Sequence, residues 1–273
     1  MRSDIWNPGS IIAEQIIYDY SSGISARKLG FKYDVADVTI TDFLKRNNVF
    51  IRNRSNAKRT NQIKEDIFDE INEESAYWIG FILADGNIYY PKNRSKQLNF
   101  GLKESDREHL EKFKKFVGSN KQLYYNNKAV FLSIYSNRIV DKIEEYGITQ
   151  RKSLTAKVPE MLKNNRHFWR GVVDGDGWVT INKEGYPTIG LCGTIDVIKS
   201  FIELTGKRVK IGQPNLDKNF VQIAYTTTSA QILCKYLYDD SEIYLNRKYE
   251  NYEKICLWKA EYVQNRSALC ISN

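Results

Sequence analysis

The 273-residue chain has few of the side chains from which several common catalytic and structural sites are built. Its two histidines, His109 and His167, are too few for a histidine-rich nuclease site or a serine-based triad, and we expect structural or surface roles for both. The cysteines have no close-paired spacing, so we predict neither a zinc ribbon nor a disulfide framework but reduced core thiols: Cys192, Cys234, Cys256 and Cys270.

Long apolar runs are absent as well. No stretch of the sequence approaches the roughly 18 apolar residues of a membrane span, and the first residues lack the apolar segment of a secretory signal. We therefore expect an intracellular protein, in the cytoplasm of a bacterial or phage-infected cell.

Basic residues, by contrast, are in excess. The chain has 41 Lys and Arg against 33 Asp and Glu, which gives a formal net charge of +8 and a pI near 9.1. Such a balance favours polyanionic partners, although the sign of the charge alone does not define a function.

The most informative feature is an internal repeat. Residues 78–86, WIGFILADG, return in altered form at residues 169–177, WRGVVDGDG. The spacing is constant, because 169−78, 171−80 and 177−86 all equal 91. An apolar, helix-length run that ends twice in Asp-Gly predicts one structural unit used twice.

Small residues recur four apart in each run, Gly80 with Ala84 and Gly171 with Gly175. This spacing gives each helix a side without bulk, so the two helices can pack with their backbones close together at Gly80 and Gly171. We expect Gly86 and Gly177 to end the helices in the left-handed conformation. The carboxylates of Asp85 and Asp176 then lie at adjacent helix ends.

Two converging carboxylates repel each other unless one is protonated or a hard cation lies between them, and Mg²⁺ prefers such oxygen ligands. Asp85 and Asp176 therefore predict a divalent-metal site. The alternative is that both Asp-Gly pairs only end helices.

The order of elements after each run is also repeated. The alternating strand at 97–103 precedes a helix that starts at Ser105-Asp106, and the strand at 186–191 precedes a helix that starts at Thr194. Strands at 129–135 and 220–225 follow, each with its own helix, and aligning the tyrosines gives an offset of 225−135, or 90. The pattern thus predicts the order helix, two strands, helix, two strands, helix for each unit. Each unit closes on a basic pair, at 151–152 or 247–248.

These residues resemble the LAGLIDADG homing endonucleases, whose signature is a helix of this length ending in Asp-Gly; the resemblance covers roughly residues 63 to 258. It implies an α+β fold, a duplicated αββαββα domain with pseudo-twofold symmetry whose sheets lie along the DNA major groove. It further implies a monomer that cleaves both strands of a long DNA target with two or more Mg²⁺ ions. The catalytic acids would be Asp85 and Asp176, and the carbonyls of Ala84 and Gly175 would be further metal ligands.

The sequence departs from that family at the auxiliary basic residues near the metals. The last strands end at Ser136 and Thr226, and the second-strand position in the first unit is near Gly101, so Lys103 is the candidate substitute. The alternative, which we favour, is that Lys103 is solvated or faces a phosphate, and it is therefore also a candidate DNA contact. Basic residues in or beside the predicted hairpins are candidate phosphate contacts, with solvated hairpin tips as the alternative: Lys92, Arg94, Lys96, Lys128, Lys183, Lys210 and Lys218.

The first 51 residues predict a separate small all-α domain with helices at 11–20, 25–30 and 37–46 that resembles a helix-turn-helix. In such motifs the last helix enters the major groove, which makes Lys45 and Arg46 candidate DNA contacts. The segment from Gly30 to Asp37 is longer than the usual turn, and the alternative is a three-helix bundle that only packs on the rest of the chain. Residues 52–62 predict a basic linker, with Arg52 and Arg54 as further DNA contacts.

The predicted organisation is therefore residues 1–51, the linker 52–62, a first half 63–153 and a second half 154–273. The expected function is site-specific, metal-dependent cleavage of double-stranded DNA. A non-catalytic DNA-binding regulator and an RNA-splicing maturase are the alternatives on the same scaffold.

Overall fold

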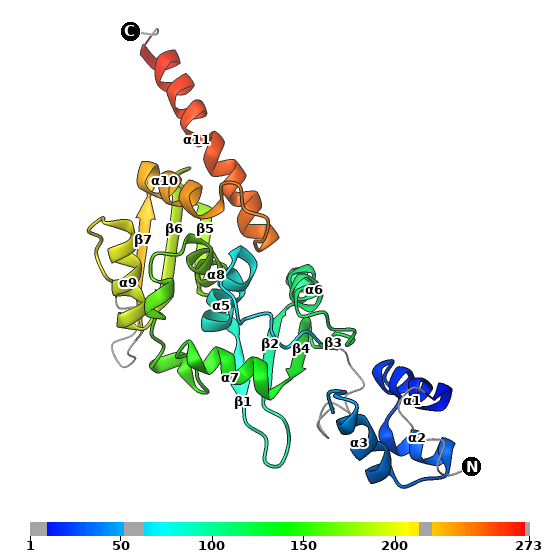
Figure 1. Ribbon diagram of the computed structural model, residues 1–273. Helices are drawn as coiled ribbons and strands as arrows, with labels where there is room; N and C mark the ends of the chain where they lie inside the picture. Colours follow the sequence, from blue (N-terminus) through cyan, green and yellow to red (C-terminus); the bar gives the residue numbers. More distant parts are fainter. Residues whose placement is uncertain (1–9, 52–62, 213–219, 271–273) are drawn as a thin grey trace. The chain divides into compact units, whose positions relative to one another are not determined.

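The computed structural model describes residues 10–51, 63–212 and 220–270, with side chains as far as residue 258 in the last helix. The chain divides into two compact units, one ending at Thr60 and the other beginning at Asn61 (Figure 1). The predicted linker lies outside the described residues. No helix in the described ranges is long and apolar enough to cross a membrane.

The first unit contains three helices, α1 (Ile11–Ser21), α2 (Ala26–Tyr33) and α3 (Asp37–Arg46). The Ser10 and Ser25 hydroxyls cap α1 and α2 by accepting hydrogen bonds from backbone N–H groups of the first turn. The three helices enclose a small apolar core of their own: Ala13, Ile16, Tyr20, Leu29, Ile40, Phe43 and Leu44.

The turn between α2 and α3 is shorter than the sequence suggested. Helix α2 continues through Gly30 to Tyr33, where Asp34 adopts the left-handed conformation, so only residues 34–36 separate the two helices. A Cβ at Gly30 would lie 2.6 Å from the Val35 carbonyl oxygen, which explains the glycine within the helix. A three-residue turn is the usual length in a helix-turn-helix.

The second unit is an α+β structure whose first half has the predicted order of helix, two strands, helix, two strands and helix. These elements are α5 (Glu73–Asp85), β1 (Asn87–Tyr89), β2 (Gln97–Lys103), α6 (Arg107–Phe116), β3 (Tyr124–Asn126), β4 (Ala129–Tyr135) and α7 (Asn137–Glu145). Short 3-10 turns at Glu104–Asp106, Lys152–Leu154 and Glu160–Leu162 lie between elements.

The second half begins in the same way and ends on a longer helix. Its elements are α8 (Arg166–Asp176), β5 (Gly177–Ile181), β6 (Pro187–Gly193), α9 (Ile195–Thr205), β7 (Val221–Thr226), α10 (Thr227–Tyr238) and α11 (Asn246–Cys270). Within the described residues the fourth strand is represented by one bridge between Gly212 and Gln222, so this sheet has three strands.

Both sheets are antiparallel, in the orders β1-β2-β4-β3 and β5-β6-β7. Their registers give a constant repeat offset: Leu98 pairs with Ile134 and Ile189 pairs with Tyr225, and both 189−98 and 225−134 equal 91. The sequence alignment that matched Tyr135 with Tyr225 was therefore wrong by one residue. Such a slip exchanges the two faces of a strand.

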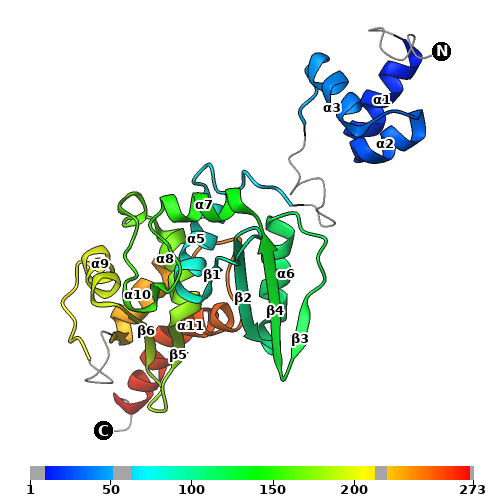
Figure 2. The same cartoon turned by 90° about the horizontal axis from the view of Figure 1, so that it is seen from below.

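Helices α5 and α8 pack against each other between the two sheets (Figures 1 and 2). A Cβ added to Gly80 would lie 2.0 Å from the carbonyl oxygen of Phe168, and one added to Gly171 would lie 2.0 Å from that of Tyr77. These contacts are related by the repeat, since both 171−80 and 168−77 equal 91. The predicted close approach of the backbones at the two glycines is present.

The ends of these helices differ from the prediction. Gly86 has φ −71° and Gly177 has φ −107°, so both are extended rather than left-handed. A Cβ at Gly86 would lie 2.7 Å from the Ile82 carbonyl oxygen, and one at Gly177 would lie 2.6 Å from that of Gly190. Because each helix passes directly into a strand, these positions require space rather than a positive φ.

We predict that Gly80→Ala and Gly171→Ala each destabilise the second unit by about 3 kcal/mol or more, because a methyl group must fit where two backbones meet. Gly193→Ala is the matched control, since its Cβ would make an ordinary 3.5 Å contact with Val197. Thermal unfolding measures the effect. Equal melting temperatures for all three variants and the wild type would contradict the backbone contact.

Candidate active site

Asp85 and Asp176 are the last residues of α5 and α8, at the same end of the helix pair. A Cβ on Gly175 would lie 3.5 Å from the Asp85 carboxyl carbon and 2.3 Å from the Ala84 Cβ, so the two helix ends are in contact. Strands β1 and β5 begin immediately beyond them. The predicted convergence of one aspartate from each repeat is therefore present.

The electrostatics agree with this geometry. Loss of solvent around the carboxyl group and then the negative charge of Asp85 raise the pKa of Asp176 to about 6. Partial desolvation also raises the pKa of Asp85, although its side chain keeps access to solvent, and the lysines nearby oppose that shift. Asp176 also lines a small cavity of about 120 Å³ beside Lys152. Both carboxylates are thus less stable as anions here than in water.

Two lysines that the sequence reasoning did not select lie at this site. The Lys152 ammonium donates hydrogen bonds to the carbonyl oxygens of Ala84 (3.2 Å) and Gly86 (2.5 Å) at the end of α5. Lys248 is buried and donates to three carbonyl oxygens at the end of α8: Val173 (2.6 Å), Asp174 (2.7 Å) and Gly177 (2.7 Å). Each lysine thus caps the helix of its own half.

The lysines also balance the charge of the acid pair. Desolvation lowers the pKa of Lys248 to about 8 and lowers the pKa of Lys152, while the aspartates oppose both shifts. Among the lysines, Asp85 is influenced most by Lys248, and Asp176 most by Lys152, so each ammonium acts chiefly on the aspartate of the other half. Two carboxylates and two ammonium groups together carry no net charge.

These lysines were visible in the sequence only as the second members of the basic pairs that close each half. Their offset, 248−152, is 96 rather than 91, which disguised the equivalence. Arg247, the first member of the second pair, contacts both carboxylate oxygens of Asp106 at 3.1 Å. Lys103, the suggested substitute, is an exposed residue at the end of β2.

The donor set fits a divalent cation through the two carboxylates. In the described ranges no group of three or more His, Cys, Asp or Glu side chains gathers at one point, so carbonyl oxygens, water or substrate phosphates would complete the coordination. The Ala84 carbonyl accepts a hydrogen bond from Lys152, but a carbonyl oxygen has a second lone pair. The raised pKa of Asp176 is the property that a bound cation would reverse.

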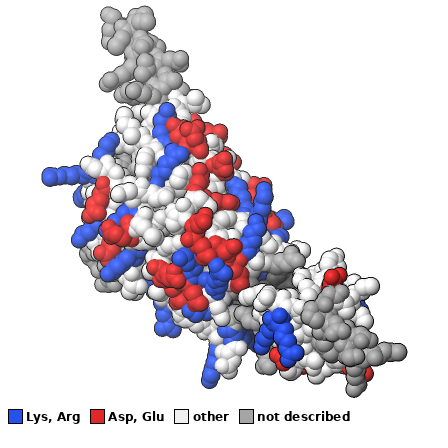
Figure 3. Space-filling view, in the orientation of Figure 1, with Lys and Arg blue, Asp and Glu red and all other residues white. Residues whose placement is uncertain are grey.

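The candidate DNA contacts are distributed unevenly. Lys96 contacts the carboxylates of Asp141 (2.6 Å) and Glu144 (2.5 Å), so its charge is already compensated. Basic and acidic groups are also interspersed on the face shown in Figure 3. Arg52, Arg54 and Lys218 lie outside the described residues. The other candidates are all exposed: Lys45, Arg46, Lys92, Arg94, Lys103, Lys128, Lys183 and Lys210.

Few charged side chains of the strands themselves point to the uncovered faces of the two sheets, although the Lys121 ammonium lies over the Tyr135 ring of the first sheet. In β1, β2, β4 and β7 alternate residues are buried on the helix side, and the residues between them point to the opposite face. The first sheet presents amides and aromatic rings there, with Lys103 as the cation of β2: Asn87, Tyr89, Gln97, Asn99, Phe131 and Tyr135. The second presents Trp178, Thr180, Thr188, Cys192 and Gln222.

Solved structures with the same fold are LAGLIDADG homing endonucleases. The meganuclease I-AabMI bound to uncleaved DNA has a TM-score of 0.52 at 16% identity, covering 70% of this chain and 93% of its own. A double mutant of I-SmaMI has a TM-score of 0.52 at 15% identity, covering 73% and 94%. I-LtrWI bound to its target DNA has a TM-score of 0.50 at 13% identity, covering 70% and 92%.

No family model and no curated protein matches the chain. At these identities the structural likeness establishes the LAGLIDADG fold, as the resemblance in the repeat implied.

We predict that Asp176→Asn stabilises the protein at pH 7.5. An aspartate whose pKa is raised to about 6 from 3.8 costs the folded state stability once both states are ionised. The gain should be about 2 to 6 °C in melting temperature, or about 1 to 2 kcal/mol after allowance for solvent screening. It should shrink below pH 6 and vanish below pH 3.8, because the folded and then the unfolded aspartate take up a proton.

Thermal unfolding in metal-free buffer from pH 4 to 8 checks this, and the neighbouring substitution Thr180→Ala, on the exposed face of β5, controls for effects unrelated to the acid pair. A melting temperature that falls at pH 7.5 on Asp176→Asn would show that the carboxylate is not under electrostatic strain.

Proposed function

We propose that the protein is a site-specific endonuclease that cleaves both strands of a long double-stranded DNA target and requires Mg²⁺. The observation that carries this proposal is the convergence of Asp85 and Asp176, one from each repeat, where both sheets begin. A site with one acid from each of two related halves suits a substrate with two related strands. The DNA-bound endonucleases of the same fold support this reading.

The carboxylates of Asp85 and Asp176 would hold the metal, with the carbonyls of Ala84 and Gly175 as further ligands. When bound, Mg²⁺ lowers the pKa of attacking water and stabilises the leaving 3′ oxygen. The charges of the two aspartates and the two lysines cancel. The negative charge of the scissile phosphates would therefore be balanced by divalent ions. Neither aspartate is needed as a general base.

The two lysines would act differently. Lys248 uses all three of its N–H groups on carbonyl oxygens, so it supplies a fixed positive charge beside Asp85. Lys152 uses two on the carbonyls of Ala84 and Gly86, which leaves one N–H to orient a phosphate oxygen or a water molecule. Both roles require the lysines to remain protonated, and the negative charges of Asp85 and Asp176 favour the protonated form of each lysine.

The uncovered sheet faces would carry base recognition. Amides such as Asn99 and hydroxyls such as Thr188 can hydrogen-bond to base edges in the major groove. The exposed lysines and arginines would contact phosphates and make binding depend on salt. A binding protein, whether regulator or maturase, remains the alternative, but it would gain nothing from two strained carboxylates placed beside phosphates.

We predict that Asp85→Asn and Asp176→Asn each abolish double-strand cleavage and leave DNA affinity within about threefold of the wild type, since phosphate contacts supply most affinity. The substrate is obtained by incubating the wild type with a randomised duplex library in Mg²⁺ and sequencing the cleaved ends. Cleavage and electrophoretic mobility-shift assays on that site follow. Unimpaired cutting by either variant would exclude the proposed site, and a library without cleaved ends would favour the binding protein.

We further propose that the first unit contacts a flanking part of the target through Lys45 and Arg46 in α3, which are exposed. Removal of residues 1–60 should then shorten the footprint and lower its salt dependence without abolishing cleavage, because the second unit has its own core and both acids. DNase footprinting at several salt concentrations tests this. Identical footprints and salt slopes would assign the first unit a packing role.

A further inference from the structure

Two polar residues interrupt the apolar repeat within α8. Arg170 and Asp174 occupy the positions that Ile79 and Leu83 occupy in α5, since 170−79 and 174−83 both equal 91. Their exposed fractions are 0% and 1%. Burying two charged groups is costly unless they are fully hydrogen-bonded, so their partners indicate what they hold in place.

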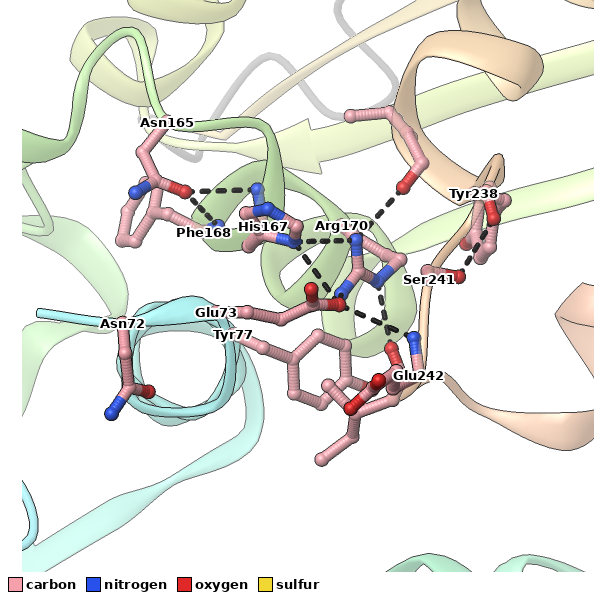
Figure 4. Close-up of polar contacts among 12 residues, drawn as sticks. Asn72, Glu73, Tyr77, Asn165, His167, Phe168, Arg170, Tyr238, Ser241 and Glu242 are labelled. Carbon is pink, nitrogen blue, oxygen red and sulfur yellow. Dashed lines mark hydrogen bonds and ion pairs between the residues drawn. The ribbon is translucent and has the colours of Figure 1, made fainter.

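Arg170 fixes the segment that connects α10 with α11. Its guanidinium donates to the carbonyl oxygens of Ile243 (2.7 Å) and Leu237 (3.0 Å), and to the Glu73 carboxylate of α5 (3.0 Å). Figure 4 shows the guanidinium enclosed between Glu73 and this segment, where the Glu242 N–H also donates to Glu73. One arginine therefore ties the connecting segment to helices of both halves.

Asp174 fixes the end of the same segment. Its carboxylate accepts hydrogen bonds from the hydroxyls of Tyr238 (2.6 Å) and Tyr77 (2.8 Å) and from the Leu245 N–H (2.8 Å). The Leu245 carbonyl in turn accepts from the N–H of Lys248 at 2.9 Å, in the first turn of α11. The Asp174 carboxylate is thus one hydrogen-bonded turn away from the lysine beside the acid pair.

Asp174 also holds that lysine from the other side. Its carbonyl oxygen is one of the three that accept from the Lys248 ammonium. Lys248 is therefore fixed through its backbone by the Asp174 carboxylate and through its side chain by the Asp174 carbonyl.

In the part of the chain that the structure describes, the first half shows no equivalent arrangement. Leu83 replaces Asp174, and Phe168, at the position equivalent to Tyr77, has no hydroxyl to donate. Within the described ranges Lys152 is held by two carbonyl oxygens, and it is more exposed than Lys248.

We propose that Asp174 is the positioning residue for Lys248, so that the two halves of the active site are fixed by different means and can be impaired separately. This inference rests on the proposed function for its effect on cleavage, but the anchoring of Lys248 can be measured without DNA. Loss of the Asp174 carboxylate should release the turn at residues 245–248 and Lys248, and leave Lys152 in place.

The first experiment measures lysine accessibility in the full-length protein. Wild type, Asp174→Asn and the double variant Tyr77→Phe/Asp174→Leu, which introduces the residues found at the equivalent positions of the other half, are acetylated with an N-hydroxysuccinimide ester and analysed by mass spectrometry. Labelling of Lys248 should rise by about tenfold or more, the change that corresponds to losing one buried hydrogen bond. Labelling of Lys152 should not change.

Ile143→Ala is the matched control for stability, because Ile143 is a fully buried core residue of α7, a helix that contributes none of the groups around Asp174 and Lys248. It should lower the melting temperature without changing the ratio of Lys248 to Lys152 labelling. Two results would overturn the inference: unchanged labelling of Lys248 in both Asp174 variants, or equal increases at Lys248 and Lys152, which would assign Asp174 a purely structural role.

The second experiment measures cleavage of each strand in a selected target carrying a different fluorophore on each strand. Asp174→Asn should slow one strand about tenfold or more and leave the other within about twofold. Combined with Lys248→Met it should add nothing to the effect of Lys248→Met alone, because Asp174 acts through Lys248. Equal slowing of both strands, or additive effects, would contradict positioning. If the wild type cleaves neither strand, the proposed function fails, and the labelling result still decides the role of Asp174.

Discussion

The close contact of α5 with α8 is the constraint on which the rest of the second unit depends. Gly80 and Gly171 allow each helix to lie against a backbone carbonyl of the other. This contact brings Asp85 and Asp176 to one place, although they are 91 residues apart (176−85). It also sets both sheets, because β1 and β5 leave the helix ends without an intervening loop. Gly86 and Gly177 provide the space for that direct passage from helix to strand.

Placing two carboxylates close together is electrostatically unfavourable, and much of the surrounding structure offsets this repulsion. Lys152 and Lys248 cap the two helices and place positive charge beside the aspartates. Keeping Lys248 buried in turn requires a fixed turn at the start of α11, which the buried polar groups of α8 and the tyrosines around Asp174 hold. The two acids of the site are therefore related by the repeat, whereas the groups that hold the two lysines in place differ between the halves. A single chain can acquire such asymmetry because each half carries its own sequence.

The repeat allowed much of this structure to be predicted from sequence. Small residues four apart and two Asp-Gly ends predicted the helix pair and its acids, and the α+β fold followed from strands of matching order. The left-handed conformation predicted for Gly86 and Gly177 was wrong, because a helix usually ends in a turn, whereas these two helices lead directly into strands. The one-residue error at Tyr135 arose because matching two tyrosines ignores which face of the strand is buried.

The site lysines were missed for a different reason. Their carbonyl partners are backbone groups, which leave no trace in the side-chain pattern, and the spacing between the lysines had drifted from the repeat. Arg170 and Asp174 did leave a signal, since they are polar residues where the first copy has Ile79 and Leu83. Departures from a repeat can thus be as informative as its matches.

The convergence of the two aspartates is tested most directly by the titration of the Asp176 carboxyl carbon, followed by NMR in the wild type and in Asp85→Asn without metal. The account predicts a pKa near 6 in the wild type, which falls when the charge of Asp85 is removed. It also predicts a fall when Mg²⁺ is added to the wild type, because a bound cation favours the carboxylate. A pKa for Asp176 that stays the same in Asp85→Asn, or that lies near the ordinary value of 3.8 in the wild type, would contradict it.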